Sequence, residues 1–185
     1  MPDWPAAVFL DRDGVVMPET GAYIVRIHEV QLLPGAAEAI RRLNDNAIPA
    51  IVVTNQAGVA RGALTSTMLA AIHLELTRRL DEAGARLDAI YACEHQDGDD
   101  CTCRKPLPGM LVCGAEKAGV RLNNCLMIGD SPRDIAAGAA VGCTTVLIGP
   151  SDGAANDCTP APDHVFTSLY EAVKALVTDS SEARL

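Results

Sequence analysis

The sequence of 185 residues is poor in aromatic side chains and contains no long apolar run. One tryptophan, three tyrosines and two phenylalanines are present, so alanine, valine, leucine and isoleucine must supply most of the core. No stretch approaches the roughly 18 apolar residues that a membrane-spanning helix needs. The first residues, MPDWPAAVFLDRDG, lack the basic flank and the apolar stretch of a secretory signal peptide. We therefore expect a cytoplasmic protein without a membrane partner.

An excess of positive charge is also missing. The formal net charge is −9 at pH 7, with 15 basic and 24 acidic residues. A nucleic-acid-binding surface needs a dense basic stripe, so the composition argues against a nucleic-acid partner. A small anionic substrate remains compatible with this charge, because a few local cations and a metal ion are enough to bind a phosphate.

Short apolar segments alternate with amphipathic segments along the chain. The apolar segments predict strands at 6–10, 48–53, 88–93, 125–128 and 144–149, and the amphipathic ones predict helices at 34–46, 64–84, 108–119 and 132–141. A weaker edge strand and a last helix are expected within 164–177. This alternation implies an α/β fold with three α/β/α layers and a Rossmann-like parallel sheet. The length suits a single domain over 1–185, with a frayed tail at 179–185.

Polar residues end three of the expected strands. Asp11 ends the first, Thr54 and Asn55 end the second, and Asp130 ends the fourth. In parallel sheets ligands bind beyond the carboxyl ends of the strands, so these side chains mark a candidate site. Asp11 and Asp13 form a D-x-D pair, which alone would also fit an ordinary acidic turn or the metal site of a nucleotide-sugar glycosyltransferase.

Four ordered motifs resemble those of the haloacid dehalogenase-like phosphatases. FLDRDGVV resembles their first motif, VVTNQ their second, RKP around Lys105 their third and GDSPRD their fourth. The resemblance runs from about Val8 to Val146, and a glycosyltransferase would explain only the D-x-D pair. It implies a phosphatase with the haloacid dehalogenase-like fold. The short gap between Asp13 and Thr54 leaves no room for a large cap domain.

The motif residues suit hydrolysis of a phosphate monoester. Asp11 would attack phosphorus and form an aspartyl-phosphate, while Asp13 would act as general acid and then as general base. Asp11 and Asp130, with the backbone carbonyl of Asp13, would bind Mg²⁺. Lys105 and the hydroxyl of Thr54 would neutralise and bind the phosphoryl oxygens.

Further residues are expected around this centre. Asn55, Gln56 and Ser131 would contribute to substrate binding. Asp134 could orient Lys105 or a metal-bound water, or it could be only an acidic residue favoured by the helix dipole. Ser131 stands where related enzymes usually have a lysine or arginine, and Arg133 could take over that phosphate contact.

A cluster of cysteines precedes the third motif. Cys93, His95, Cys101 and Cys103 give three thiolates and one imidazole, a set suited to tetrahedral Zn²⁺. Four protein ligands leave no open position, so the zinc would be structural and would fasten the loop 93–103. The remaining cysteines, at 113, 125, 143 and 158, are scattered, and most are expected to be buried thiols.

A zinc loop directly before RKP narrows the resemblance to the branch of heptose-bisphosphate and histidinol phosphatases. The runs QAGVARG and KPLPGML favour a phosphorylated heptose as the substrate, within heptose biosynthesis for lipopolysaccharide or capsule. This resemblance implies that Arg104 recognises the sugar phosphate, that the loop from Glu19 to Tyr23 contacts the sugar, and that Arg61 serves the distal phosphate. Histidinol phosphate is the alternative substrate, and a catalytically silent, zinc-stapled phosphate-binding module is the alternative from another class.

Overall fold

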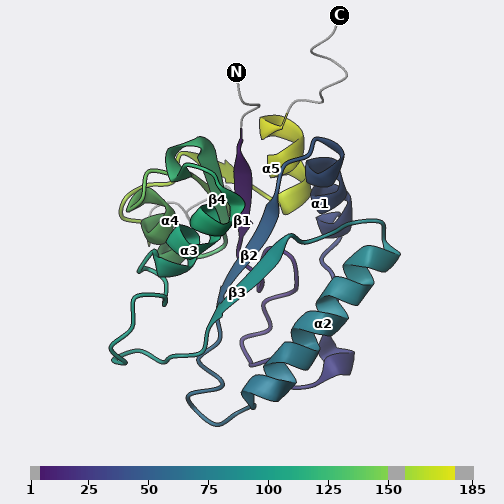
Figure 1. Ribbon diagram of the computed structural model, residues 1–185, viewed down its shortest axis with the longest axis vertical. Coiled ribbons are helices and arrows are strands. Elements are labelled where there is room, and N and C mark those ends of the chain that lie inside the picture. Colours follow the sequence, from purple (N-terminus) through teal and green to yellow (C-terminus); the bar gives the residue numbers. More distant parts are fainter. Residues whose placement is uncertain (1–4, 150–156, 178–185) are drawn as a thin grey trace, which may run out of the picture.

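The computed structural model describes residues 5–149 and 157–177 and contains one six-stranded parallel sheet (Figure 1). The strand order is β3-β2-β1-β4-β5-β6. The strands are β1 (Ala7–Leu10), β2 (Ala50–Asn55), β3 (Ala89–Cys93), β4 (Cys125–Gly129), β5 (Thr144–Ile148) and β6 (His164–Phe166). The predicted parallel sheet is therefore confirmed, whereas the tail at 179–185 lies outside the described residues.

Helices cover both faces of the sheet and make the three predicted layers (Figure 1). The helices are α1 (Ala36–Asp45), α2 (Ser66–Glu82), α3 (Gly109–Ala118), α4 (Pro132–Ala139) and α5 (Leu169–Leu176), with short 3₁₀ turns η1 (Ile27–Glu29) and η2 (Leu122–Asn124). α1, α2 and α5 pack on one face of the sheet, and α3 and α4 pack on the other.

The strands form because their side chains alternate between two apolar layers. Val8 and Leu10 of β1 pack in the core beneath α1, α2 and α5, while Ala7 and Phe9 pack in the core beneath α3 and α4. All four are fully buried. A strand buried on both faces reads as a continuous apolar run, which is how β1 was recognisable in the sequence.

The α2 helix begins and packs as its sequence predicts. The hydroxyl of Thr65 accepts a hydrogen bond from the Met68 N–H at 3.1 Å, which caps the helix. The buried stripe consists of Leu69, Ile72, Leu76 and Leu80. Burying one such side chain contributes about 1.5–3 kcal/mol, so this stripe holds α2 against the sheet.

The second strand differs from the prediction, which placed it at 48–53. Ile48 donates its N–H to Leu43 in the preceding turn at 2.9 Å, and Pro49 has no N–H to offer a ladder. The strand therefore starts at Ala50 and continues to Asn55. As a result Thr54 and Asn55 pair with β3 and have a fixed backbone, instead of lying in a loop after the strand.

The structure can also be compared with the expectations about a cap domain and about the scattered cysteines. Between β1 and β2 the described elements are only η1 and α1, which agrees with the absence of a large cap domain. Cys125, Cys143 and Cys158 are buried as expected, but Cys113 is exposed. Among the described residues no helix is long and apolar enough to cross a membrane.

Candidate active site

The sheet order brings the first and fourth motifs together. From β1 the chain proceeds through β2 and β3 toward one edge, whereas β4, β5 and β6 extend toward the other edge. β1 and β4 are therefore neighbours, and the Asp11 N–H donates to the Ile128 carbonyl at 2.9 Å. Such a switch in strand order opens a crevice at the carboxyl ends of the strands, where Asp11 and Asp130 both lie.

Lys105 is the buried cation of this crevice. Its Nζ lies 2.9 Å from Asp11 Oδ1, 2.5 Å from Asp134 Oδ1 and 2.8 Å from the Val53 carbonyl oxygen. Burial would lower the pKa of Lys105, but the carboxylates of Asp11 and Asp134 outweigh it and raise that pKa above its ordinary value. Lys105 thus stays charged, and Asp134 both contacts it at 2.5 Å and serves as the acidic residue in the first turn of α4.

The backbone of Lys105 is clamped to the end of β2. Asn55 Nδ2 donates to the Lys105 carbonyl at 2.9 Å, and the Lys105 N–H donates to Asn55 Oδ1 at 3.0 Å. This reciprocal pair lets the third motif reach the crevice from an irregular loop, because a strand residue fixes it at both backbone groups.

Three carboxylates gather around the crevice and could hold a metal ion. One oxygen each of Asp11, Asp130 and Asp134 lies within 4.8 Å of the other two. Burial raises the pKa of Asp11 to about 7 against the opposing effect of Lys105, and burial together with Asp134 raises the pKa of Asp130 to about 6. A hard divalent cation would relieve this repulsion, so the donor set fits the expected Mg²⁺.

Two glycines allow the carboxylates to approach so closely. A Cβ on Gly14, whose φ is +80°, would lie 2.0 Å from Asp130 Oδ2. A Cβ on Gly129 would lie 2.1 Å from the Asp134 Cβ. A side chain at either position would clash with the neighbouring aspartate, which explains the glycines of the first and fourth motifs.

Asp13 is held by a network of polar side chains. Arg12 binds its two oxygens bidentately, from Nε at 3.1 Å and from Nη2 at 2.9 Å. Gln56 Nε2 donates to Asp13 Oδ2 at 3.0 Å and to the Thr54 hydroxyl at 2.8 Å. The second motif therefore positions a side chain of the first.

The sequence interpretation missed two members of this network, Arg12 and His73. Arg12 is only 1% exposed, and its Nη1 lies 3.1 Å from His73 Nε2 on α2. Arginine can only donate, so the His73 nitrogen accepts. Burial and the charge of Arg12 lower the pKa of His73 to about 4, which keeps it neutral. In the sequence, the position of His73 next to Ile72 of the buried stripe indicated that the side chain of His73 would face the protein interior.

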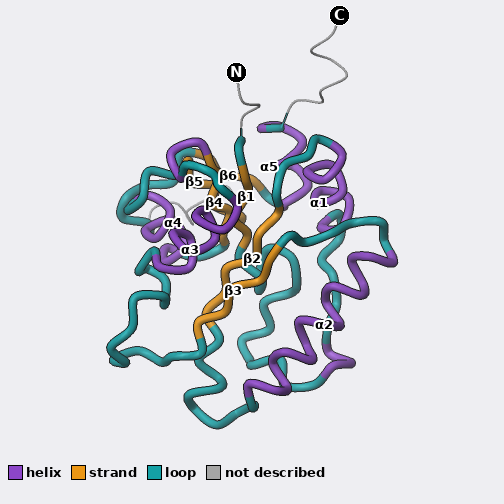
Figure 2. Tube along the Cα trace, viewed as in Figure 1, coloured by secondary structure: helices purple, strands orange, loops and turns teal. Residues whose placement is uncertain are grey.

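The four predicted zinc ligands come together at Cys93, the last residue of β3, and in the loop between β3 and α3, which Figure 2 shows to be free of helix and strand. Their ligand atoms all lie within 4.8 Å of one another, and the Sγ atoms of Cys93 and Cys103 are 3.1 Å apart. His95 Nδ1 lies 3.6 Å from the first sulfur and 3.3 Å from the second. Neighbouring ligands of a tetrahedral zinc are about 3.5–3.8 Å apart, so this set could bind the ion after little adjustment.

Burial raises the pKa of two of the three thiols, Cys93 and Cys103, so ligation would have to displace their protons. Burial raises the pKa of Cys93 to about 12, which disfavours a free thiolate. The backbone N–H of Arg104 acts in the opposite sense on Cys101 and lowers its pKa. A zinc ion would bind all three sulfurs as thiolates, as ligation requires.

Two adjoining pockets share the carboxyl end of the sheet. The first, of about 310 Å³, is lined by Asp11, Asp13, Glu19, Thr54, Asn55, Lys105, Asp130, Ser131, Arg133 and Asp134. The second, of about 560 Å³, is lined by Arg12, Asp13, Glu19, Gly21, Ala22, Tyr23, Ile24, Asn55, Gln56 and Arg61. The sequence-predicted substrate residues line one pocket or the other, with Arg104 as the exception.

A larger cavity of about 690 Å³ lies on the other side of Gly14 and Asp130. Its lining includes the apolar side chains of Leu33, Pro34 and Ile148. An apolar wall does not suit a phosphorylated, polar ligand, so the two smaller polar pockets match the chemistry of the motifs better.

Arg104 is directed into the zinc loop. Its Nε donates to Asp97 Oδ1 at 2.8 Å, and its Nη1 donates to the His95 carbonyl at 3.2 Å. Ser131 also has an internal partner, because its hydroxyl donates to Asp134 Oδ2 at 2.8 Å. The Ser131 N–H donates to the same oxygen at 3.1 Å as part of the capping box of α4, and Ser131 nevertheless lines the smaller pocket.

Comparison with known proteins agrees with the motifs. The family model of the haloacid dehalogenase-like hydrolases matches residues 5–142. The chain is 40% identical over 146 residues to the D-glycero-beta-D-manno-heptose-1,7-bisphosphate 7-phosphatase of Bordetella bronchiseptica, covering 79% of this chain and 82% of the relative. It is 37% identical to the protein of that name from Pseudomonas aeruginosa, covering 92% and 97%.

Solved structures indicate the same family relationship as the sequence comparisons. The D,D-heptose 1,7-bisphosphate phosphatase of B. bronchiseptica, crystallised with magnesium and phosphate, superposes with a TM-score of 0.83 at 36% identity, covering 92% of this chain and 97% of that one. A putative phosphatase from Mesorhizobium loti gives 0.81 at 30% identity, covering 97% and 91%. The resemblance carried by the four motifs is thereby confirmed: the chain belongs to the haloacid dehalogenase-like hydrolase family, among its phosphatases.

Proposed function

We propose that this protein is a Mg²⁺-dependent phosphomonoesterase that removes the 7-phosphate of D-glycero-D-manno-heptose 1,7-bisphosphate through an aspartyl-phosphate. The observation that carries the proposal is the position of Asp11, whose carboxylate contacts the buried Lys105 at 2.9 Å and adjoins Asp130. The names of the relatives support the substrate, and the pathway would be heptose biosynthesis for a surface glycan. We assign the activity to a single domain over 1–185.

In the first step, an oxygen of Asp11 bonds to phosphorus while the bond from phosphorus to the C7 oxygen of the sugar breaks. Asp13 gives its proton to that departing oxygen. Lys105 and the Thr54 hydroxyl stabilise the phosphoryl oxygens. Asp11, Asp130 and the backbone carbonyl of Asp13 would hold Mg²⁺, which supplies positive charge that lets two anions approach.

In the second step, water attacks the phosphorus of the aspartyl-phosphate and passes a proton to Asp13. The bond between phosphorus and the Asp11 oxygen breaks, and the free carboxylate returns together with inorganic phosphate. The bidentate contact from Arg12 and the hydrogen bond from Gln56 hold Asp13 in place for both proton transfers.

The two adjoining pockets suit a substrate that places its reacting phosphate in one pocket and its sugar in the other. The reacting phosphate would occupy the smaller pocket, and the sugar would lie toward the larger, where Glu19, Tyr23 and Arg61 line the wall. Arg61 Nη1 donates to the Tyr23 hydroxyl at 2.7 Å, so these two side chains already form one surface. Arg104 and Arg133 are the further cations available for the second phosphate.

Phosphate release from three substrates tests this proposal. With Mg²⁺ present, kcat/KM for heptose 1,7-bisphosphate should exceed that for histidinol phosphate and for fructose 1,6-bisphosphate by at least about 100-fold, because a site that binds buried polar groups rejects ligands lacking them. A higher kcat/KM for histidinol phosphate than for heptose 1,7-bisphosphate would mean that histidinol phosphate is the substrate. Failure to release phosphate from any of the three would favour a catalytically silent binding module.

We further propose that the loop 93–103 binds one structural Zn²⁺ through Cys93, His95, Cys101 and Cys103. The loop has no regular structure of its own, and Arg104 and Lys105 follow its last ligand directly. An ion that fixes the loop end would therefore position the catalytic lysine, although it touches no reacting group.

Metal analysis and one substitution test the zinc proposal. Wild-type protein should contain one tightly bound Zn²⁺ per chain, and Cys101→Ser should lower the zinc content and reduce turnover about 10–100-fold while the sheet stays folded. Cys113→Ser, at an exposed cysteine outside the cluster, is the matched control and should change neither. A Cys101→Ser variant that loses zinc but keeps wild-type kinetics would remove the positioning role.

A further inference from the structure

Asp97 forms an ion pair with Arg104. The Asp97 side chain is 70% exposed, whereas that of Arg104 is 10% exposed, and their contact from Oδ1 to Nε is 2.8 Å. Neither pocket at the carboxyl end of the sheet includes Arg104 in its lining. An anion that binds at the Nε of Arg104 would therefore have to replace the Asp97 carboxylate there.

The same carboxylate attracts a second arginine of the site. Arg61 Nη2, from the segment after β2, lies 3.7 Å from Asp97 Oδ2. One exposed carboxylate thus pairs with two guanidinium groups that come from two different segments of the chain.

We propose that Asp97 is an internal competitor for the second phosphate of the substrate and thereby weakens the binding of a bisphosphorylated sugar. This inference rests on the proposed function. Asp97 occupies the guanidinium groups of Arg104 and Arg61 in the free enzyme. A substrate phosphate must displace the carboxylate to bind there, and a substrate without a second phosphate leaves the contact closed.

The exposure of Asp97 makes this exchange possible. An ion pair in contact with water contributes little, because solvent screens it and two side chains must be immobilised. A phosphate offers more charge and more acceptor oxygens than a carboxylate and binds guanidinium groups bidentately. The buried arginine can therefore keep its place, held at Nη1 by the His95 carbonyl, while the exposed carboxylate swings away.

Steady-state kinetics of Asp97→Asn with heptose 1,7-bisphosphate and heptose 7-phosphate test this role. Asparagine keeps the size of the side chain but removes its charge. We expect the KM for the bisphosphate to fall about 1.5- to 5-fold, the range set by an exposed ion pair, with kcat unchanged. The KM for the monophosphate should stay at the wild-type value, because that substrate does not reach the arginines.

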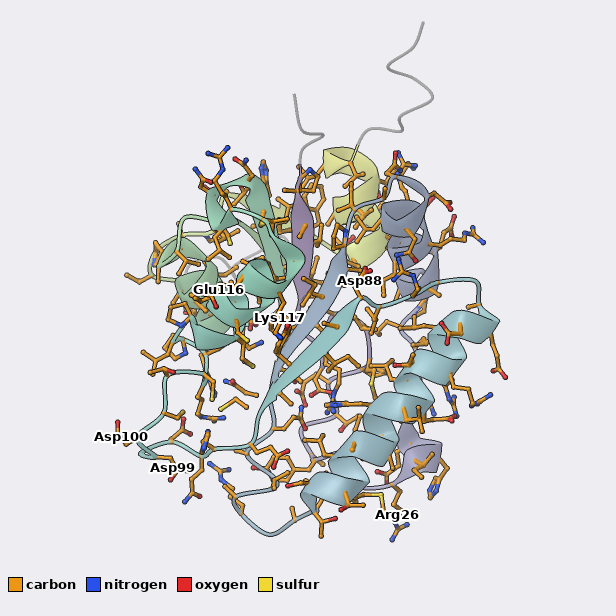
Figure 3. The ribbon with its side chains drawn as sticks, in the orientation of Figure 1. Arg26, Asp88, Asp99, Asp100, Glu116 and Lys117 are labelled. Carbon is orange, nitrogen blue, oxygen red and sulfur yellow. The ribbon has the colours of Figure 1, made fainter. Side chains whose placement is uncertain are left out.

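The matched control is Asp100→Asn, which removes the same charge from an exposed position at the outer end of the same loop (Figure 3). It should leave both KM values unchanged, and zinc analysis should show the metal retained in both variants. In an Arg104→Ala background, Asp97→Asn should lose most of its effect on the bisphosphate.

Three results would overturn the inference. A higher KM for the bisphosphate would mean that Asp97 holds Arg104 in a binding position, and an unchanged KM would mean that the two anions do not compete. If Asp97→Asn changed both KM values equally, or if Asp100→Asn changed KM as Asp97→Asn does, the effect would come from the net charge of the loop and not from competition at the arginines. If wild-type enzyme releases no phosphate from heptose 1,7-bisphosphate, the proposed function fails instead.

Discussion

Asp11→Asn is expected to lower turnover on the order of 10⁴-fold or more, since the amide oxygen cannot attack phosphorus as a carboxylate does. The fold should survive, because Lys105 keeps its contacts with Asp134 and the Val53 carbonyl. The substitution also removes one of three clustered carboxylates, so the free energy of unfolding should not fall. Phosphate release and thermal unfolding measured on the same sample check both expectations.

The control is Asp88→Asn at the opposite end of the sheet (Figure 3). Asp88 precedes β3 and accepts the Ala50 N–H at 2.9 Å, a contact that asparagine can keep through its carbonyl oxygen. This variant should retain wild-type turnover. If Asp11→Asn kept more than a few per cent of activity, Asp11 would not be the nucleophile.

Asp13→Asn is expected to lower turnover of the sugar phosphate about 10²–10⁴-fold, the usual contribution of a general acid. The loss should be much smaller with an aryl phosphate such as para-nitrophenyl phosphate, because its leaving group departs without a proton. Asparagine keeps one oxygen for Arg12, but its amide NH2 group faces another donor, so the bidentate contact is lost while one hydrogen bond remains. The ratio of the two losses is the quantity to measure.

Equal losses on both substrates would contradict the assignment of Asp13 as the acid. They would indicate that the charge of Asp13 acts on binding or on the metal. The Asp88→Asn variant serves again as the control and should give a ratio of one.

Most of the fold was predictable because the strands are buried on both faces. β1 and β4 read as short, continuous apolar runs that end at an aspartate, and α2 shows a regular stripe between its cap and its final glycine. The start of β2 was misplaced because the apolar Ile48 continues the pattern, although its N–H bonds to the preceding turn. Apolar patterning reports burial and does not report hydrogen-bond partners.

The centre of the site was predictable for a different reason. Asp11, Thr54 and Asp130 lie at the ends of neighbouring parallel strands, so the sheet alone brings them together. Lys105 could be assigned to the site only from the RKP motif, because it lies in an irregular loop and not at the end of a strand. The sequence left three roles open for Asp134, and the structure shows two of them, the contact with Lys105 and the acidic position in the first turn of α4.

The surroundings of the site were not predictable from the sequence. The contact between Arg12 and His73 joins residues 61 positions apart, and no local pattern reports it. The contact of Arg104 with Asp97 depends on the path of a loop that has neither helical nor strand periodicity. The sequence therefore predicted Arg104 as a cation of the site but could not show that an internal carboxylate occupies it.

The central position of β1 has a consequence for the nascent chain on the ribosome. β1 pairs with β2, which follows soon, and with β4, which is translated much later. At about 5–20 residues per second, the end of β4 at Gly129 is made roughly 6–24 s after the end of β1 at Leu10. During this interval one edge of β1 has no partner strand, and an open apolar edge invites pairing with other chains. Translation pauses between β3 and β4 should therefore lower the yield of soluble enzyme more than pauses after β4.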